Sequence, residues 1–219
     1  MKEGFPIAGG TEKLIYKDPK NANRVLKRYR EEETSETHLV RARFYLAKIL
    51  HGLMPNNFPD IHQSTSKPNQ VIMDRVTLDA DHAELQRVLK TTSQHQVNLG
   101  PVGREKFRAY RDARKADPRV IGLIQTLKDT GIDFDQASLN FSLDSDAAVY
   151  LDTIEPWEEA IDRESDNAPI LKRNFDTEKL HQRIQGLAND SERECLGIYL
   201  DRLTELYSAE KTEFEKHEK

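Results

Sequence analysis

The chain has 219 residues, of which 37% are hydrophobic and 32% are charged, with both signs of charge interspersed. This composition is typical of a folded protein with a strongly solvated surface and excludes an intrinsically disordered chain. The formal net charge of -5 argues against nucleic acid or an anionic membrane as the partner, and no apolar run approaches the length of a bilayer-spanning helix.

The cysteine content and the first residues indicate a compartment. The single cysteine, Cys195, cannot form an intramolecular disulfide, and the first ten residues contain no apolar signal core. Both features favour a reducing environment, so we expect a cytoplasmic protein. We also expect Cys195 on the buried side of a helix, where packing is a more common role for cysteine than nucleophilic catalysis.

Short extended segments separated by turns dominate the first third of the chain. A turn containing Gly9 and Gly10 follows the first of them, and the segment KDPKNAN separates the second from the third. Together these segments predict a five-stranded antiparallel sheet. The expected strands are residues 5–7, 12–16, 24–29, 58–63 and 70–76.

One helix is expected between the third and fourth strands. From Thr34 onward the hydrophobic period lengthens from two residues to that of a helix, with Leu39, Leu46 and Leu50 on one stripe, and Pro55 ends the pattern. An apolar face of this kind can cover one side of the sheet.

Strand signals become scarce beyond Leu78. Residues 79–115 are mainly helical in composition, and Asp117 with Pro118 begins a further helix. A small hairpin, residues 140–143 and 149–152, interrupts this helical region, and we expect the rest of the chain to be helical. The sequence therefore predicts an α+β fold of two lobes, residues 1–78 and residues 79–219.

Three polar residues surround the small hairpin. Asp135 lies five residues before Asn140, which begins the first strand, and Asp152 ends the second. Carboxylate and amide oxygens suit Mg²⁺, which takes a few protein ligands and completes its shell with water and phosphate oxygens. A carboxylate beside them can orient or deprotonate an attacking hydroxyl.

This spacing resembles that of the protein-kinase-like superfamily, especially its small-molecule branch typified by aminoglycoside and choline phosphotransferases. There, a catalytic aspartate is followed five residues later by a metal-binding asparagine, and a second aspartate follows a short hairpin. The resemblance implies that Asp135 is the catalytic aspartate and that Asn140 and Asp152 bind Mg²⁺. It also implies a two-lobed kinase-like fold with a five-stranded sheet lobe and a mainly helical lobe.

The N-terminal segments resemble the small lobe of the same superfamily. In RVLKRY, Lys27 resembles the strand lysine that binds the nucleotide phosphates, and Val25, on the same face, would lie against adenine. Gly9 and Gly10 resemble a shortened glycine-rich turn that approaches the phosphates. By the same resemblance, Met73 in VIMDRV falls where the fifth expected strand enters the hinge segment of that superfamily.

Two further assignments follow from the resemblance. The backbone from Asp74 to Val76 would offer hydrogen bonds to the adenine edge. Glu36 is the preferred partner for Lys27, with Glu32 and Glu33 as alternatives.

The sequence therefore predicts an ATP-dependent and Mg²⁺-dependent phosphotransferase. Its partners would be the nucleotide and a small molecule with a hydroxyl group, because too few residues separate Asp152 from the expected final helices for a long activation segment. Two alternatives stay open: a pseudokinase or nucleotide-binding regulatory protein without transfer, and a helical interaction protein with no nucleotide site.

Two other patterns bear on ligands. The acidic run that begins at Glu155 is either a solvated helix face or a wall that favours a cationic acceptor. The seven histidines include no close pair at metal-ligand spacing, so the sequence predicts no zinc site.

Overall fold

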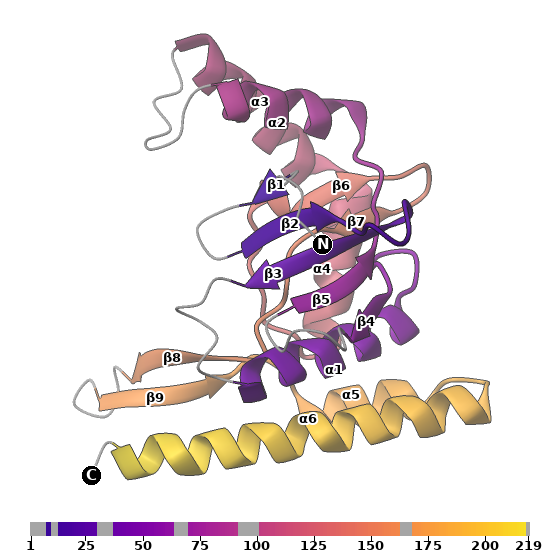
Figure 1. Cartoon of the computed structure of the whole chain (residues 1–219), viewed down its shortest axis with the longest axis vertical. Helices are drawn as coiled ribbons and strands as arrows, with labels where there is room; N and C mark the ends of the chain where they lie inside the picture. Colours follow the sequence, from indigo (N-terminus) through magenta and orange to yellow (C-terminus); the bar gives the residue numbers. More distant parts are fainter. Residues whose placement is uncertain are drawn as a thin grey trace.

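The computed structural model describes residues 8–9, 13–29, 37–63, 70–91, 101–162 and 168–217, and Figure 1 shows their arrangement. Its largest sheet consists of four antiparallel strands, β2-β3-β5-β4, extended at the β2 edge by the two-residue strand β1. The expected strand at residues 5–7 lies outside the described residues. The strands are β1 (Ala8–Gly9), β2 (Lys13–Lys17), β3 (Arg24–Tyr29), β4 (Ile61–Gln63) and β5 (Gln70–Asp74).

Strand β3 lies at the centre of this sheet because it pairs with both β2 and β5. Along β3, Val25 and Lys27 are buried while Leu26 and Arg28 are half-buried, as expected for side chains that alternate between the two faces of a strand. Val25 lies opposite Met73 of β5. The predicted bounds of this strand are confirmed.

Helix α1 (Thr37–Leu53) lies between the sheet and helix α6 (Asp190–His217) (Figure 1). On its sheet side, Val40 packs with Ile61 and Val71 in a small apolar cluster. Its other side enters a larger core, in which Leu46 and Ile49 are fully buried. The helix therefore packs into two apolar clusters, one on each side, which explains its many hydrophobic residues.

The larger core also contains residues from the hairpin and the last helices. Helix α6 packs along α1, where Gly52 approaches the side chain of Leu196 so closely that a Cβ would lie 2.7 Å from Leu196 Cδ1. Tyr45 of α1 stacks on Tyr199 of α6. The elements are α4 (Pro118–Asp129), β6 (Phe141–Leu143), β7 (Ala148–Tyr150), α5 (Thr177–Gln185) and α6 (Asp190–His217).

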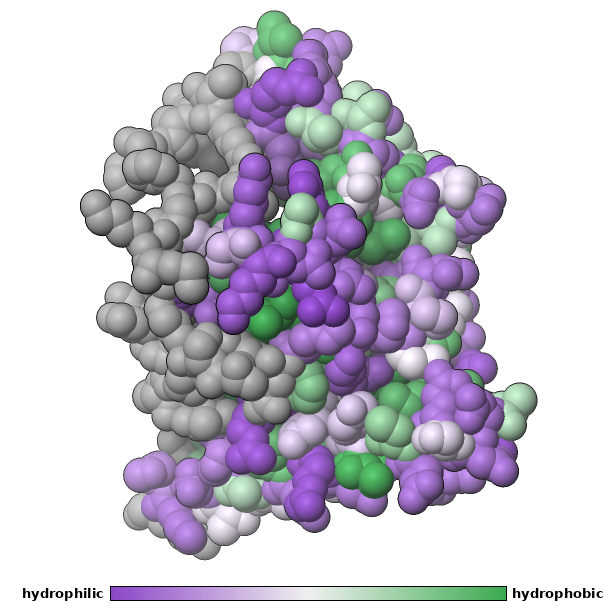
Figure 2. All heavy atoms as spheres, turned by 45° about the vertical axis from the view of Figure 1, so that its right-hand side comes forward, coloured by the Kyte–Doolittle hydropathy of each residue, from purple (hydrophilic) through white to green (hydrophobic). Residues whose placement is uncertain are grey.

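Helices α2 (Ala80–Thr91) and α3 (Pro101–Ala116) pack on each other at the end of the molecule away from α6 (Figure 1). The face shown in Figure 2 is largely hydrophilic, with hydrophobic residues in small separate patches. Within the residues that the structure describes, every helix is too short or too polar for a membrane-spanning segment.

The expectation of an entirely helical segment after Asp152 is wrong. Strands β8 (Trp157–Asp162) and β9 (Ala168–Arg173) form an antiparallel hairpin there. Trp157 is buried against Tyr207, and opposite charges meet across the strands where Glu158 Oε1 lies 3.3 Å from Lys172 Nζ. Such cross-strand pairs stabilise the β8–β9 hairpin. The acidic composition of this segment alone does not predict them.

Two smaller expectations are also wrong. Gly9 was expected in a turn but ends β1, where it pairs with Leu14 of β2, while Gly10 lies outside the described residues. Cys195 is exposed, since α6 turns it away from the stripe formed by Leu196, Leu200 and Leu203.

The α+β class is confirmed by these helices and antiparallel sheets. The division into residues 1–78 and 79–219 stays a prediction. Helix α1 belongs to the first range, yet it contributes to the same core as α4, α5 and α6 of the second.

The shared core predicts a large cost for truncating α6. Leu203 is 0% exposed, so Leu203→Ala should lower the free energy of unfolding by about 2–5 kcal/mol. Ile198 on the same helix is 53% exposed, so Ile198→Ala should change it by less than about 0.5 kcal/mol. Urea unfolding of the two variants measures the difference, and equal stabilities would contradict docking of α6 on the core.

Candidate functional site

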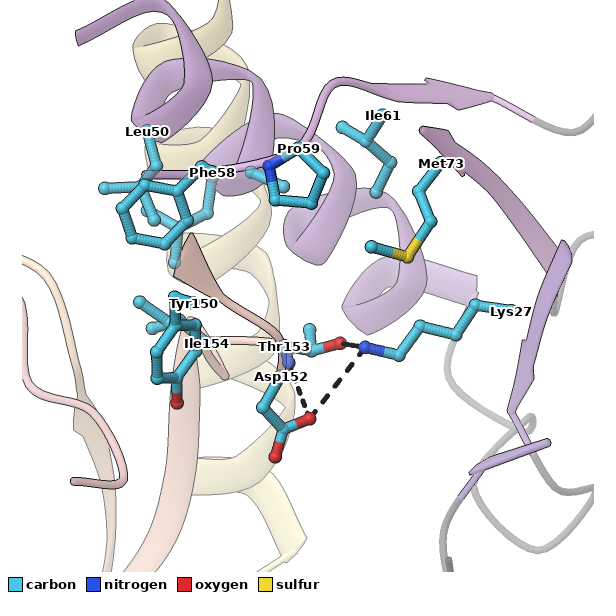
Figure 3. Close-up of a pocket in the computed structure, with 12 residues that line it drawn as sticks. Lys27, Leu50, Phe58, Pro59, Ile61, Met73, Tyr150, Asp152, Thr153 and Ile154 are labelled. Atoms are coloured by element: carbon cyan, nitrogen blue, oxygen red, sulfur yellow. Dashed lines mark hydrogen bonds and ion pairs between the residues drawn. The ribbon is translucent and has the colours of Figure 1, made fainter. Parts of the chain in front are cut away.

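Lys27 is the most deeply buried charged side chain at the candidate site. It is 3% exposed, and its Nζ lies 3.9 Å from Asp152 Oδ1 and donates a hydrogen bond to Thr153 Oγ1 (Figure 3). The Thr153 amide donates to Asp152 Oδ1 at 2.7 Å. Burial of an ammonium group is costly unless charge and hydrogen bonds compensate it. The structure therefore brings together two predicted site residues from distant parts of the chain.

Lys27, Asp152 and Thr153 border a small and mainly apolar cavity with a volume of about 40 Å³. Figure 3 shows its wall, which includes Leu50, Phe58 and Met73. A space of this size accommodates a few water molecules but no nucleotide. A nucleotide would therefore have to reach Lys27 and Asp152 from outside the cavity.

Asp135 and Asn140 contact each other directly. Asn140 Nδ2 donates to Asp135 Oδ2 at 3.0 Å, and the Ala137 amide donates to Asp135 Oδ1 at 2.9 Å. These bonds form a compact loop that ends in the 3-10 turn η2 (Ser138–Asn140). The side-chain nitrogen of Asn140 donates to Asp135, so the side-chain oxygen of Asn140 is the atom that could coordinate a cation. Asp135 itself is exposed.

Tyr150 connects this loop to Asp152. Its hydroxyl donates to the Asp135 carbonyl oxygen at 3.1 Å, while the Leu151 amide donates to the Asn140 carbonyl at 2.8 Å. Burial raises the pKa of Tyr150, and the negative charges of Asp152 and Asp135 raise it further. The three predicted residues Asp135, Asn140 and Asp152 therefore surround one buried phenol, although Lys27 reaches only Asp152 among them.

A second polar network holds the start of β6, and the sequence interpretation missed it. The carboxylate of Asp79 accepts hydrogen bonds from the Leu143 amide at 2.8 Å and the Ser142 hydroxyl at 2.9 Å, and it pairs with buried Arg114. Burial opposes ionisation of Asp79, but these bonds outweigh it and lower its pKa to about 2.

The same network continues into α2 and α3. The ring of buried His82 lies 2.7 Å from the Tyr110 hydroxyl, which donates to the Phe141 carbonyl at 3.0 Å. Burial lowers the pKa of His82, so its neutral form is favoured. One part of this network could have been predicted from the sequence, because Asp79 directly precedes a helix, as an N-cap residue does. Its carboxylate accepts a hydrogen bond from the His82 amide. Its pairing with Arg114 is not local and has no sequence signature.

A further ion pair was also missed. Arg43 of α1 is buried, and its Nε lies 2.6 Å from Glu155 Oε2, three residues beyond Asp152. A buried arginine paired with a carboxylate fixes the position of both partners. It ties the segment after Asp152 to α1.

The remaining predicted residues fall into three groups. Met73 lines the cavity behind Lys27, and Val25 is buried opposite it. Asp74 and Val76 line a different and larger cavity. Glu36 and Gly10, with the alternatives Glu32 and Glu33, lie outside the described residues.

The expected adenine contacts on the backbone are partly occupied by the protein. The Asp74 amide donates to the Asp60 carbonyl at 2.9 Å, and the Arg75 amide donates to the Asn23 carbonyl at 2.8 Å. Of the predicted hinge amides, Val76 is therefore the better candidate for an outside partner.

Comparisons with known proteins give little guidance. No protein-family model matches the sequence, and no curated protein matches it. Among solved structures, this chain resembles the Rio2 kinase-ADP/Mg²⁺-phosphoaspartate complex from Chaetomium thermophilum, with a TM-score of 0.32 and 15% sequence identity. The match covers 94% of this chain and 54% of that one, so the chain spans about half its length. This similarity is too low to establish a shared fold or function.

The depressed pKa of Asp79 predicts a pH dependence of stability. Because its folded pKa of about 2 lies below the ordinary value of 3.8, its contribution is complete above about pH 4 and is lost as the pH falls toward 2. Over that interval the parent should lose about 2 kcal/mol more stability than Asp79→Asn. Urea unfolding across the pH range measures this. Exposed Asp201→Asn should track the parent, and parallel profiles for the parent and Asp79→Asn would contradict the assignment.

Proposed function

We propose that the chain is an ATP-dependent phosphotransferase in which Lys27 and Asp152 bind the Mg²⁺-nucleotide. The observation that carries this proposal is the buried Lys27 ammonium held beside the Asp152 carboxylate. A fixed cation beside a fixed anion suits a phosphate group bridged by a metal ion, because the lysine attracts the phosphate oxygens and the carboxylate attracts the metal.

Asn140 and Asp152 would hold Mg²⁺ from the protein side. The hydrogen bond from Asn140 Nδ2 to Asp135 orients the amide so that its oxygen is available to a cation. Mg²⁺ is a hard cation that uses a few protein oxygens and takes the rest of its octahedral shell from water and phosphates. The metal would neutralise the charge on the transferred group.

Asp135 would position the acceptor. Its exposed carboxylate can accept a hydrogen bond from the hydroxyl of a small molecule. In the transfer step, the acceptor oxygen forms a bond to the γ-phosphorus as the bond to the β,γ-bridging oxygen breaks. The hydroxyl proton passes to Asp135, and ADP leaves with the bridging oxygen. Positioning and charge neutralisation would supply most of the rate enhancement.

We propose also that the arrangement is kinase-like, with nucleotide bound by a lobe of residues 1–78 against a helical lobe of residues 79–219. The support is the order of the elements: a lysine on the central strand β3, a helix, two more strands, and then the loop and hairpin with Asp135, Asn140 and Asp152. Gly9, Val25 and Met73 lie on strands of the same sheet and would flank the nucleotide.

A second candidate function is nucleotide binding without transfer, as in a pseudokinase. Two observations favour it. Both carboxylate oxygens of Asp135 accept hydrogen bonds from within the loop, and Lys27 already donates to the Thr153 hydroxyl. Such contacts can keep a binding site intact while holding the acceptor position closed.

Removal of the buried cation tests nucleotide binding. Lys27→Met should weaken Mg²⁺-ATP binding by more than about tenfold, because it removes a charge that contacts phosphate. Lys17→Met, on the exposed side of neighbouring β2, is the matched control and should bind like the parent. Isothermal titration with and without Mg²⁺ makes the comparison. Absence of Mg²⁺-dependent ATP binding in the parent would reject both candidate functions.

Removal of the proposed proton acceptor separates the two candidates. Asp135→Asn should keep Mg²⁺-ATP affinity within about threefold but reduce phosphoryl transfer by more than about a hundredfold. The assay follows ADP release from ATP with a panel of small hydroxyl compounds, including amine-bearing ones. ATP binding in the parent with no transfer to any acceptor would favour the regulatory protein.

A further inference from the structure

Three potential metal ligands meet at one corner of the main sheet, away from the Lys27–Asp152 pair. Asp60 and His62 are two residues apart on and just before edge strand β4, so their side chains lie on the same face. Asp74 ends the neighbouring strand β5, and its amide donates to the Asp60 carbonyl at 2.9 Å. Strand register, and not sequence spacing, brings the three together.

Their ligand atoms have the separations of a metal site. His62 Nε2 lies 3.6 Å from Asp60 Oδ2 and 3.6 Å from Asp74 Oδ1, and all three atoms lie within 4.8 Å of one another. The nearest point equidistant from three atoms at these separations is about 2.0 to 2.4 Å from each, at or slightly beyond the length of zinc bonds to imidazole nitrogen and carboxylate oxygen, about 2.0–2.2 Å.

The imidazole nitrogen points to a ligand independently of the carboxylates. His62 Nε2 is inaccessible to solvent, yet it makes no hydrogen bond to any described residue. The two carboxylate oxygens at 3.6 Å are too far for hydrogen bonds. The His62 side chain as a whole is 29% exposed, but a buried polar atom is normally hydrogen-bonded. An Nε2 atom that lacks a hydrogen bond and faces two carboxylates therefore indicates a cation that binds between them.

The surroundings fit this role. Lys48 Nζ lies 2.6 Å from Asp60 Oδ1, and the Ile61 amide donates to the same oxygen at 2.8 Å, so Asp60 is held with Oδ2 toward His62. Outer contacts of this kind orient metal ligands. Asp60 and Asp74 also line an open cavity of about 540 Å³, which gives an ion access from solvent.

We propose that Asp60, His62 and Asp74 bind a divalent zinc-like cation that clamps the start of β4 to the end of β5. One imidazole and two carboxylates suit Zn²⁺ better than Mg²⁺, which rarely takes nitrogen ligands. Three protein ligands leave a coordination position for water. Arg24, whose Nε lies 3.5 Å from Asp74 Oδ1, is half-exposed and would have to turn toward solvent. The proposal does not rest on the transferase function, although the backbone of Asp74 belongs to the segment predicted to lie at the adenine edge.

Zinc titration of the full chain tests the proposal. After chelator treatment and buffer exchange, the parent should bind one equivalent of Zn²⁺ by isothermal titration and unfold at a higher temperature with zinc than without. His62→Gln and Asp74→Asn should each weaken zinc binding by more than about tenfold, since each removes a ligand. Excess Mg²⁺ should not displace the zinc.

Two controls distinguish a built site from general zinc affinity. Exposed His181→Gln should bind zinc like the parent, as should Asp152→Asn at the proposed Mg²⁺ site. His62→Gln should match the parent in circular dichroism and in metal-free unfolding temperature; Asp74→Asn serves if it does not fold. The proposal is overturned if the parent binds no stoichiometric zinc, or if binding survives loss of His62 and Asp74.

Discussion

The buried charge of Lys27 is the constraint on which the rest of the site depends. An ammonium group with 3% of its surface exposed must remain beside compensating groups, because an unpaired buried charge would cost several kcal/mol. Its contacts with Asp152 and Thr153 therefore fix the distance between central strand β3 and the segment that leaves β7. The main sheet and the β6–β7 hairpin therefore cannot separate without exposing the Lys27 ammonium group to solvent or leaving it buried and unpaired.

The elements around this contact are arranged so that the hairpin has support from several directions. Arg43 of α1 binds Glu155 just beyond it. Asp79 binds the backbone and side chain of β6 and is itself paired with Arg114 of α3. Between these charged contacts, Tyr150 packs into the apolar core and connects the loop of Asp135 to β7. A rigid frame of this kind is what positional catalysis or specific nucleotide binding requires.

Local patterns predicted much of the fold. Period-two and period-3.6 hydrophobicity, with glycine and proline punctuation, indicated β3, α1, α4 and the β6–β7 hairpin close to their observed bounds. The spacing of Asp135, Asn140 and Asp152 identified residues that the structure gathers around one buried tyrosine. These features depend on residues close in sequence, and such interactions have a recognisable pattern.

The features that escaped prediction depend on partners far apart in the chain. The β8–β9 hairpin was not predicted because its strands lie in an acidic stretch without a strong apolar alternation. The two strands are stabilised by pairing with each other. The Arg43–Glu155 pair joins residues 112 positions apart. Histidine spacing gave no sign of the cluster at His62, because Asp74 reaches it from the neighbouring strand.

A crystal structure with Mg²⁺ and a non-hydrolysable ATP analogue tests the central claim most directly. The account predicts a phosphate oxygen within hydrogen-bond distance of Lys27 Nζ and a Mg²⁺ ion coordinated by Asp152 and Asn140. Phosphates bound elsewhere, with Lys27 still donating to Thr153, would contradict it.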